Sequence, residues 1–84
     1  MTRKVLAIIV VDGRMNNMEL VKVNSSNIKA VGWENNTLFI AYNSGIYMYE
    51  DVKRELYEQL LNAESKGKFV CENIKPNFSY KKVE

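Results

Sequence analysis

The chain has 84 residues and a mass of 9.7 kDa, which provides enough apolar surface for one small core and not for two. Twelve Lys and Arg residues against ten Asp and Glu residues give a formal net charge of +2, so the total charge does not mark a nucleic-acid-binding polycation. Histidine is absent, which excludes it as a general base, as the activator of a nucleophile and as a metal ligand. We therefore predict one non-enzymatic domain with no catalytic residues, no metal site and no cofactor.

The single cysteine, Cys71, has no second thiol with which to form an intramolecular disulfide. The fold therefore needs no oxidising compartment, and we expect a cytoplasmic protein. No basic residue adjoins Cys71 in the sequence and no histidine could activate it, so we interpret it as a small buried hydrophobe.

The first predicted element is a strand. Val5–Val11 is a run of seven apolar residues rich in β-branched side chains, and it is far too short to cross a bilayer. Because the run does not alternate with polar residues, we expect both of its faces to be covered. Asp12–Gly13 predicts a turn, and after the polar residues 14–17 we expect a second short strand over Met18–Val23.

Three further strands are predicted as a meander, over Ile28–Trp33, Thr37–Asn43 and Gly45–Glu50. The connections between them are short and rich in Asn, Ser and Gly, as antiparallel hairpins require. The expected fold is therefore α+β: a small antiparallel meander of three to five strands packed against one main helix.

Apolar residues recur at helical spacing over Asp51–Glu64, which predicts the main helix. We expect Asp51 to be its N-cap and Gly67 to end it in a left-handed conformation. Lys68–Ile74 forms either a second short helix or an irregular segment, and residues 77–84 form a tail anchored by its two aromatic residues.

The most distinctive motif is Tyr47-Met48-Tyr49. On a strand, Tyr47 and Tyr49 point to one face and Met48 to the other, so both faces of the sheet carry large apolar groups. One helix covers only one face, which leaves the other to the N-terminal segment, the C-terminal tail, a second subunit or a ligand.

Two interpretations of the tyrosines stay open. They form either a stacking platform for unpaired bases, with Lys66, Lys68 and Lys75 contacting phosphates, or packing beneath the helix. The charge distribution favours a local basic region, because residues 65–82 hold five lysines and one acid, a net charge of +4.

The order of several motifs resembles one family. They are Ser25-Ser26-Asn27-Ile28, Gly45-Ile46-Tyr47-Met48-Tyr49, and Ala63-Glu64-Ser65-Lys66-Gly67 after the predicted helix. Together they resemble the KTSC domain, which occurs at the C-terminus of certain lysyl-tRNA synthetases and as a small stand-alone protein of bacteria and phages. The resemblance implies a compact domain of uncharacterised activity with a suggested RNA-binding role. Residues 18–84 form the KTSC-like domain, and residues 1–17 are an N-terminal extension that adds a strand.

Our leading hypothesis is a binding module for RNA or single-stranded nucleic acid that uses Tyr47, Tyr49 and the lysines of residues 66–75. The alternative is an accessory or anti-defence protein whose strand edge, over residues 4–11, contacts another protein or a second copy in a homodimer. Hydrolytic or nuclease activity ranks third, because no base or metal-ligand cluster can be named. No membrane partner is predicted.

Overall fold

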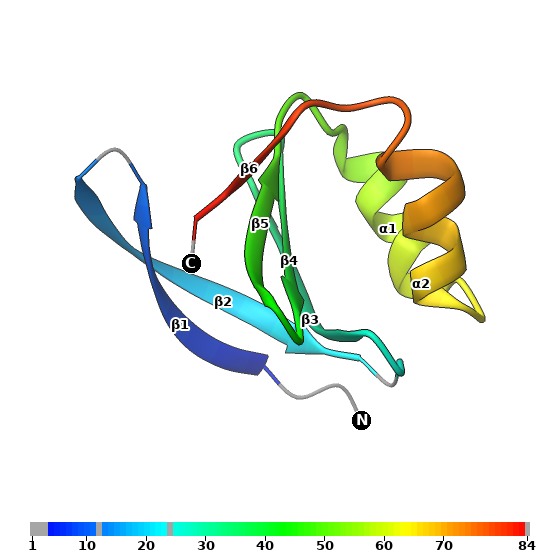
Figure 1. Ribbon diagram of the computed structural model, residues 1–84, viewed down its shortest axis with the longest axis horizontal. Helices are drawn as coiled ribbons and strands as arrows, with labels where there is room; N and C mark the ends of the chain where they lie inside the picture. Colours follow the sequence, from blue (N-terminus) through cyan, green and yellow to red (C-terminus); the bar gives the residue numbers. More distant parts are fainter. Residues whose placement is uncertain (1–3, 12, 24, 84) are drawn as a thin grey trace.

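The computed structural model describes residues 4–11, 13–23 and 25–83. Six strands form one antiparallel sheet in sequence order, and the helices pack on one side of β3, β4 and β5 (Figure 1). The elements are β1 (Lys4–Val11), β2 (Arg14–Lys22), β3 (Ile28–Glu34), β4 (Thr37–Tyr42), β5 (Gly45–Tyr49), α1 (Arg54–Asn62), α2 (Lys66–Phe69), the π-helical turn η1 (Val70–Ile74) and β6 (Tyr80–Lys82). The predicted α+β class, the antiparallel meander and the main helix are confirmed.

The first two strands form a hairpin that projects from the rest of the sheet (Figure 1). Every residue of β1 pairs with β2, whereas only Val21 and Lys22 of β2 pair with β3. We call the described residues 4–20 the arm. β2 begins at Arg14, four positions before the predicted start, because pairing with β1 continues through the polar residues 14–17 to the turn. Of the predicted turn, Asp12 lies outside the described residues, and Gly13 has a φ of +77° that favours glycine.

The main core lies between the sheet and the helices. Its fully buried residues come from β3, β4, β5, α1 and η1, and from the segment before α1: Ile28, Val31, Leu38, Ile40, Tyr49, Val52, Leu60, Val70 and Ile74. β4 supplies alternate residues, Leu38 and Ile40, as the period-two pattern predicts. In β3 the register shifts between Ile28 and Ala30, so Ile28 and Val31 both face this core although they are three positions apart. This packing fixes α2 and η1 above the sheet and so positions the site described below.

The opposite face of the sheet carries a smaller core of Leu20, Ala30, Phe39 and Met48. Val83, after β6, packs against the same cluster. Of the four covers expected for this face, the C-terminal tail therefore contributes through Val83, whereas Leu20 belongs to β2 and lies beyond the predicted extension of residues 1–17.

The helices begin and end at positions other than those predicted. Asp51 is not the N-cap, because it has a φ of +59° and α1 starts at Arg54. The reason is tertiary: the N–H of buried Val52 donates to the Asn36 carbonyl at 2.8 Å, and the Val52 carbonyl accepts from Trp33 Nε1 at 2.7 Å. These bonds hold the chain against the sheet, so the helix begins only after Val52.

The predicted left-handed glycine after α1 is also wrong, because Gly67 lies inside α2. The α1 terminus is satisfied instead by Lys66, whose Nζ donates to the Ala63 carbonyl at 2.7 Å. Residues 66–74 are helical throughout, which resolves the prediction for the segment after Gly67 in favour of a helix.

The C-terminal tail supplies a strand that the sequence did not predict. β6 pairs with β5, and backbone bonds on either side hold it: Glu50 N–H donates to the Ser79 carbonyl at 3.1 Å, and Val83 N–H donates to the Ile46 carbonyl at 2.8 Å. Phe78 packs against the main core, whereas Tyr80 stays 63% exposed. Among the described residues, no helix is long and apolar enough to span a membrane.

Candidate functional site

A cavity of about 540 Å³ lies between the sheet and the helical segment formed by α2 and η1. Its volume falls in the range of small-ligand sites. Its lining comes from the start of β3, from β4, β5 and their connection, from α2 and η1, and from β6: Asn27, Ile28, Tyr42, Asn43, Ser44, Tyr47, Tyr49, Gly67, Val70, Cys71, Lys75 and Tyr80.

Four tyrosines form most of the wall on the sheet side. Tyr42 and Tyr47 pack edge to face with ring centroids 5.3 Å apart, and Tyr80 lies 5.9 Å from Tyr47 and 5.8 Å from Tyr49. Strand pairing produces this arrangement, because Tyr49 and Tyr80 are directly opposed on β5 and β6 and therefore share a face. The result is a continuous aromatic surface beside the cavity.

Two of the tyrosines that line the cavity are bonded to each other through their hydroxyls. The Tyr42 and Tyr49 hydroxyls share a hydrogen bond of 2.9 Å, and Tyr49 is only 2% exposed. Burial raises the pKa of Tyr42, and the bond to Tyr49 raises it further. Burial also raises the pKa of Tyr49, although the same bond lowers it, so Tyr42 holds its proton more firmly. Both groups are neutral polar contacts at physiological pH.

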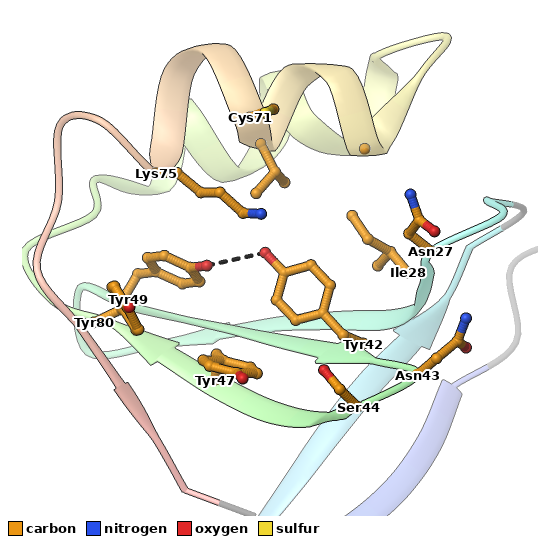
Figure 2. A pocket seen from close by; sticks show the side chains of 12 residues that line it. Asn27, Ile28, Tyr42, Asn43, Ser44, Tyr47, Tyr49, Cys71, Lys75 and Tyr80 are labelled. Atoms are coloured by element: carbon orange, nitrogen blue, oxygen red, sulfur yellow. Dashed lines mark hydrogen bonds between the residues drawn. The ribbon is translucent and has the colours of Figure 1, made fainter.

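Among the lining residues, Lys75 carries the one formal charge, and none is a carboxylate. Its Nζ lies 5.5 Å from the centre of the Tyr42 ring. Figure 2 shows Lys75 reaching from the helical side toward the bonded hydroxyls, with Asn27 and Asn43 at one end of the cavity and Tyr49 and Tyr80 at the other. The cavity therefore combines flat ring surfaces, amide and hydroxyl groups and a positive charge.

The structure separates the candidate residues predicted from the sequence into two sets. Tyr47, Tyr49 and Lys75 line the same cavity. Lys66 and Lys68 do not line it: Lys66 caps α1, as described above, and Lys68 is exposed on α2. Tyr49 belongs to the packed core, so Tyr47 is the more accessible member of the Tyr-x-Tyr motif.

Several residues at the site escaped the sequence analysis. Tyr42 and Tyr80 line the cavity, and β6 places Lys82 directly opposite Tyr47. Opposed residues on antiparallel strands share a face, so Lys82 adds a second positive charge on the tyrosine face. Its neighbour Lys81 pairs with Met48, on the opposite face. If residues 80–82 are taken as a strand, the two-residue period of strands places Lys82 on the same face as Tyr80, and this is the signal that could have found Lys82.

The expectation that Cys71 is buried is wrong, because the free thiol is exposed on η1 and lines the cavity. The buried positions of this turn are Val70 and Ile74. Cys71 follows Val70 by one position, which turns its side chain away from the core.

A second hollow of about 430 Å³ lies between β2 and α1 and has mixed charge. Glu19, Glu34 and Arg54 line it together with Trp33, and the Arg54 guanidinium lies 5.7 Å from the Trp33 ring centre. Within the described ranges, no three His, Cys, Asp or Glu side chains gather where they could hold a metal ion.

Comparison with known proteins identifies the family to which this architecture belongs. The model of the KTSC domain matches residues 24–78. The chain belongs to the KTSC domain family. A protein of Tsukamurella paurometabola is 39% identical over 59 residues, which cover 67% of this chain and 88% of that protein. The crystal structure of a KTSC domain protein from Yersinia pestis is 31% identical, with a TM-score of 0.77 over 80% of this chain and 99% of that one.

The cavity and the arm lie differently relative to the matched KTSC region. With the exception of Tyr80, every residue that lines the cavity falls within residues 24–78, whereas the whole arm lies outside that range. The cavity is therefore built mainly from the matched KTSC region, and the arm lies outside that region.

Proposed function

We propose that the cavity of this KTSC domain binds an unpaired nucleotide of RNA or single-stranded nucleic acid, as a binding module without catalytic activity. The observation that carries the proposal is the composition of the described lining residues, which include four tyrosines and one lysine and no carboxylate. A lining of this kind favours an anion that has a flat apolar part, and a nucleotide has both features.

The bases would stack on the outer tyrosines. Tyr80 is 63% exposed and Tyr47 is partly buried, so each retains accessible ring surface. Stacking of one base on one aromatic side chain contributes about 1–3 kcal/mol by alanine substitution. Bases inside a duplex have their faces covered by neighbouring bases, so this contact favours unpaired strands.

The phosphates would contact the lysines on either side of the tyrosines. Lys75 reaches the cavity from the helical side, and Lys82 on β6 lies directly opposite Tyr47 on β5. For a single strand, a plot of the logarithm of the binding constant against the logarithm of the salt concentration has a slope of about −0.7 per phosphate contacted. Two phosphate contacts therefore make binding measurably weaker at higher salt. The free thiol of Cys71 suits a reducing compartment, and we propose that the protein acts in the cytoplasm.

Fluorescence anisotropy with labelled single-stranded RNA, single-stranded DNA and a duplex of the same sequence tests the proposal. Lys82→Gln and Lys81→Gln form a matched pair, because the two lysines are adjacent on β6 but occupy opposite faces. We expect Lys82→Gln to weaken single-strand binding and to reduce the salt slope by about 0.7. Lys81→Gln keeps the slope of the parent chain.

Three results would overturn the proposal: no binding of any single strand at low salt, equal affinity for the duplex, or equal loss in the two variants. Incubation of the labelled strands with the protein, followed by gel analysis, checks the absence of catalysis. Intact strands are expected, and cleavage that requires the cavity residues would contradict a binding module.

A further inference from the structure

The two edges of the sheet differ in how they are protected from other strands. β6 is three residues long and contains two lysines, and short, lysine-bearing strands are a common means of blocking edge-to-edge pairing. β1 is eight residues long, and residues 5–11 are all apolar. Among the described strands, only β2 pairs with β1, so its outer edge is open.

The sequence of β1 is that of a central strand and not of an edge strand. A continuous apolar run is typical of a strand with a neighbour on each side and cover on both faces. In the monomer, β1 instead belongs to a two-stranded arm, which joins the sheet at its base through the packing of Leu20 and the pairing of the next residues, Val21 and Lys22, with β3. A two-stranded ribbon is marginally stable in water, so the arm lacks the support that its sequence requires.

The exposure of the described side chains of β2 is a second indication that the arm lacks support in the monomer. Met15 is 73% exposed, and Asn17 and Glu19 are exposed beside it. Met15 and Tyr80 are the two strongly exposed large hydrophobic residues in the described part of the chain. Tyr80 borders the cavity and Met15 lies on the arm, so each marks a different surface.

We propose that β1 pairs antiparallel with β1 of a second copy of this chain, about a twofold axis at the middle of the strand. An antiparallel edge is complementary to itself, because a twofold axis places the same surface on both partners. The one charge in β1 is Lys4, at its start. Pairing of all eight residues puts Lys4 opposite Val11 of the second copy, so the two lysines lie at opposite ends and do not repel each other.

The second copy supplies the strand neighbour that the outer edge of β1 lacks in the monomer. β1 becomes a central strand, and the two sheets join into one of twelve strands, twice the six of the monomer. Each dimer then presents two tyrosine cavities, which allows two-point attachment to one long ligand. The dimer does not depend on what the cavity binds, since none of the arm side chains that the structure describes lines the cavity.

Light scattering and sedimentation equilibrium of the full chain measure the dimer directly. Two double variants test its geometry: Ala7→Lys with Ile8→Lys, and Ala7→Glu with Ile8→Glu. Both positions are central in β1, so each variant alone places like charges opposite each other across the axis. We expect each to raise the dimer Kd by more than about tenfold, and an equimolar mixture of the two to restore the dimer.

Gln59→Lys and Gln59→Glu provide the control, because Gln59 is exposed on α1 and is not among the residues that line the hollow between α1 and β2. These exchanges are expected to leave the dimer Kd within about twofold of the parent. Any of three outcomes overturns the proposal: a parent chain that is monomeric at every concentration tested, a dimer that survives both double variants, or variants that stay monomeric when mixed. Cooperative unfolding of each variant shows that the KTSC core remains folded.

Discussion

The tyrosine cavity and the arm carry the two strongly exposed large hydrophobic residues in the described part of this KTSC domain, Tyr80 and Met15, and they are built in contrasting ways. The cavity is lined from β3, β4, β5, β6, α2 and η1, and its walls continue into the buried core. The arm is one hairpin, and β2 pairs with β3 only at Val21 and Lys22, just beyond it. Many elements meet at the cavity, whereas the arm depends mainly on the pairing of β1 with β2 and on the packing of Leu20 at its base.

Because of this difference, an exposed apolar residue indicates a different kind of binding surface at the cavity than on the arm. At the cavity, neighbouring elements hold Tyr47 and Tyr80 in fixed relative positions, so their exposed rings form a preorganised surface for a small flat ligand. On the arm, Met15 is exposed on a two-stranded ribbon whose other strand, β1, has an open outer edge that another strand can pair with. The first surface fits a ligand, and the second fits a strand.

The contrast between the cavity and the arm predicts its largest effect on the free energy of unfolding, at a buried residue of η1. Ile74 is fully buried in η1, beside Lys75, so Ile74→Ala is expected to lower the free energy of unfolding by about 2–5 kcal/mol. Met15→Ala, on the arm, is expected to change it by no more than about 0.5 kcal/mol. Urea titration of the two variants compares them, and equal losses would show that the arm is packed as firmly as the cavity wall.

A smaller loss is expected for Trp33→Phe. The exchange keeps an aromatic ring in the core but removes the Nε1–H that donates to the Val52 carbonyl at 2.7 Å. Loss of a donor to a partly buried carbonyl costs about 1–3 kcal/mol. Trp33 does not line the tyrosine cavity, so nucleic-acid affinity of the folded variant stays unchanged. A shift of the urea midpoint with no change in affinity is the expected result, and a parallel loss of affinity would contradict it.

The hydroxyl pair in the cavity predicts a still smaller effect with a specific pattern. Tyr49→Phe and Tyr42→Phe each remove one partner of the same 2.9 Å hydrogen bond, at a cost of about 0.5–1.5 kcal/mol. Because only one bond is lost, the double variant should be destabilised no more than either single variant. Additive losses in thermal unfolding would show that the two hydroxyls act independently.

Alkaline pH should weaken the fold gradually. Burial raises the folded-state pKa of Tyr42, Tyr49 and Tyr57 above the ordinary value of about 10. Below about pH 9 both the folded and the unfolded chain keep these protons, so their contribution to stability is complete. As the pH rises through about 10, the unfolded chain releases its protons first and stability falls.

Denaturation at pH 9 and at pH 11 measures this fall. Tyr42→Phe removes one of the groups with a raised pKa, so the variant should lose less stability between the two pH values than the parent chain. An equal or greater loss in the variant would show that Tyr42 is not among the groups responsible.

The sequence predicts the strands and their faces well because alternation is a local property. The placement of Tyr47 and Tyr49 on one face and of Met48 on the other follows from the period of a strand and is confirmed. The different exposure of the two tyrosines does not follow from it, because that depends on where α2 and η1 lie over the sheet. Tertiary contacts decide which tyrosine stays accessible.

The parts that the sequence did not predict depend on contacts between distant segments. Asp51 has a good capping side chain, but bonds from Val52 to β3 and to the turn after it delay the start of α1. β6 has no apolar alternation, and its pairing with β5 brings Tyr80 and Lys82 to the site. The apolar composition of residues 5–11 predicted a strand there. It did not predict that β2 pairs with β3 through only two residues.

A titration of the isotope-labelled protein with a short single-stranded RNA, followed by amide NMR, tests the central claim most directly. The account predicts that chemical-shift changes concentrate on Asn43, Tyr47, Cys71, Lys75 and Tyr80, around the cavity, while the arm residues 13–20 keep their shifts. Changes centred on the arm or on the outer side of α1, or no changes at low salt, would contradict it.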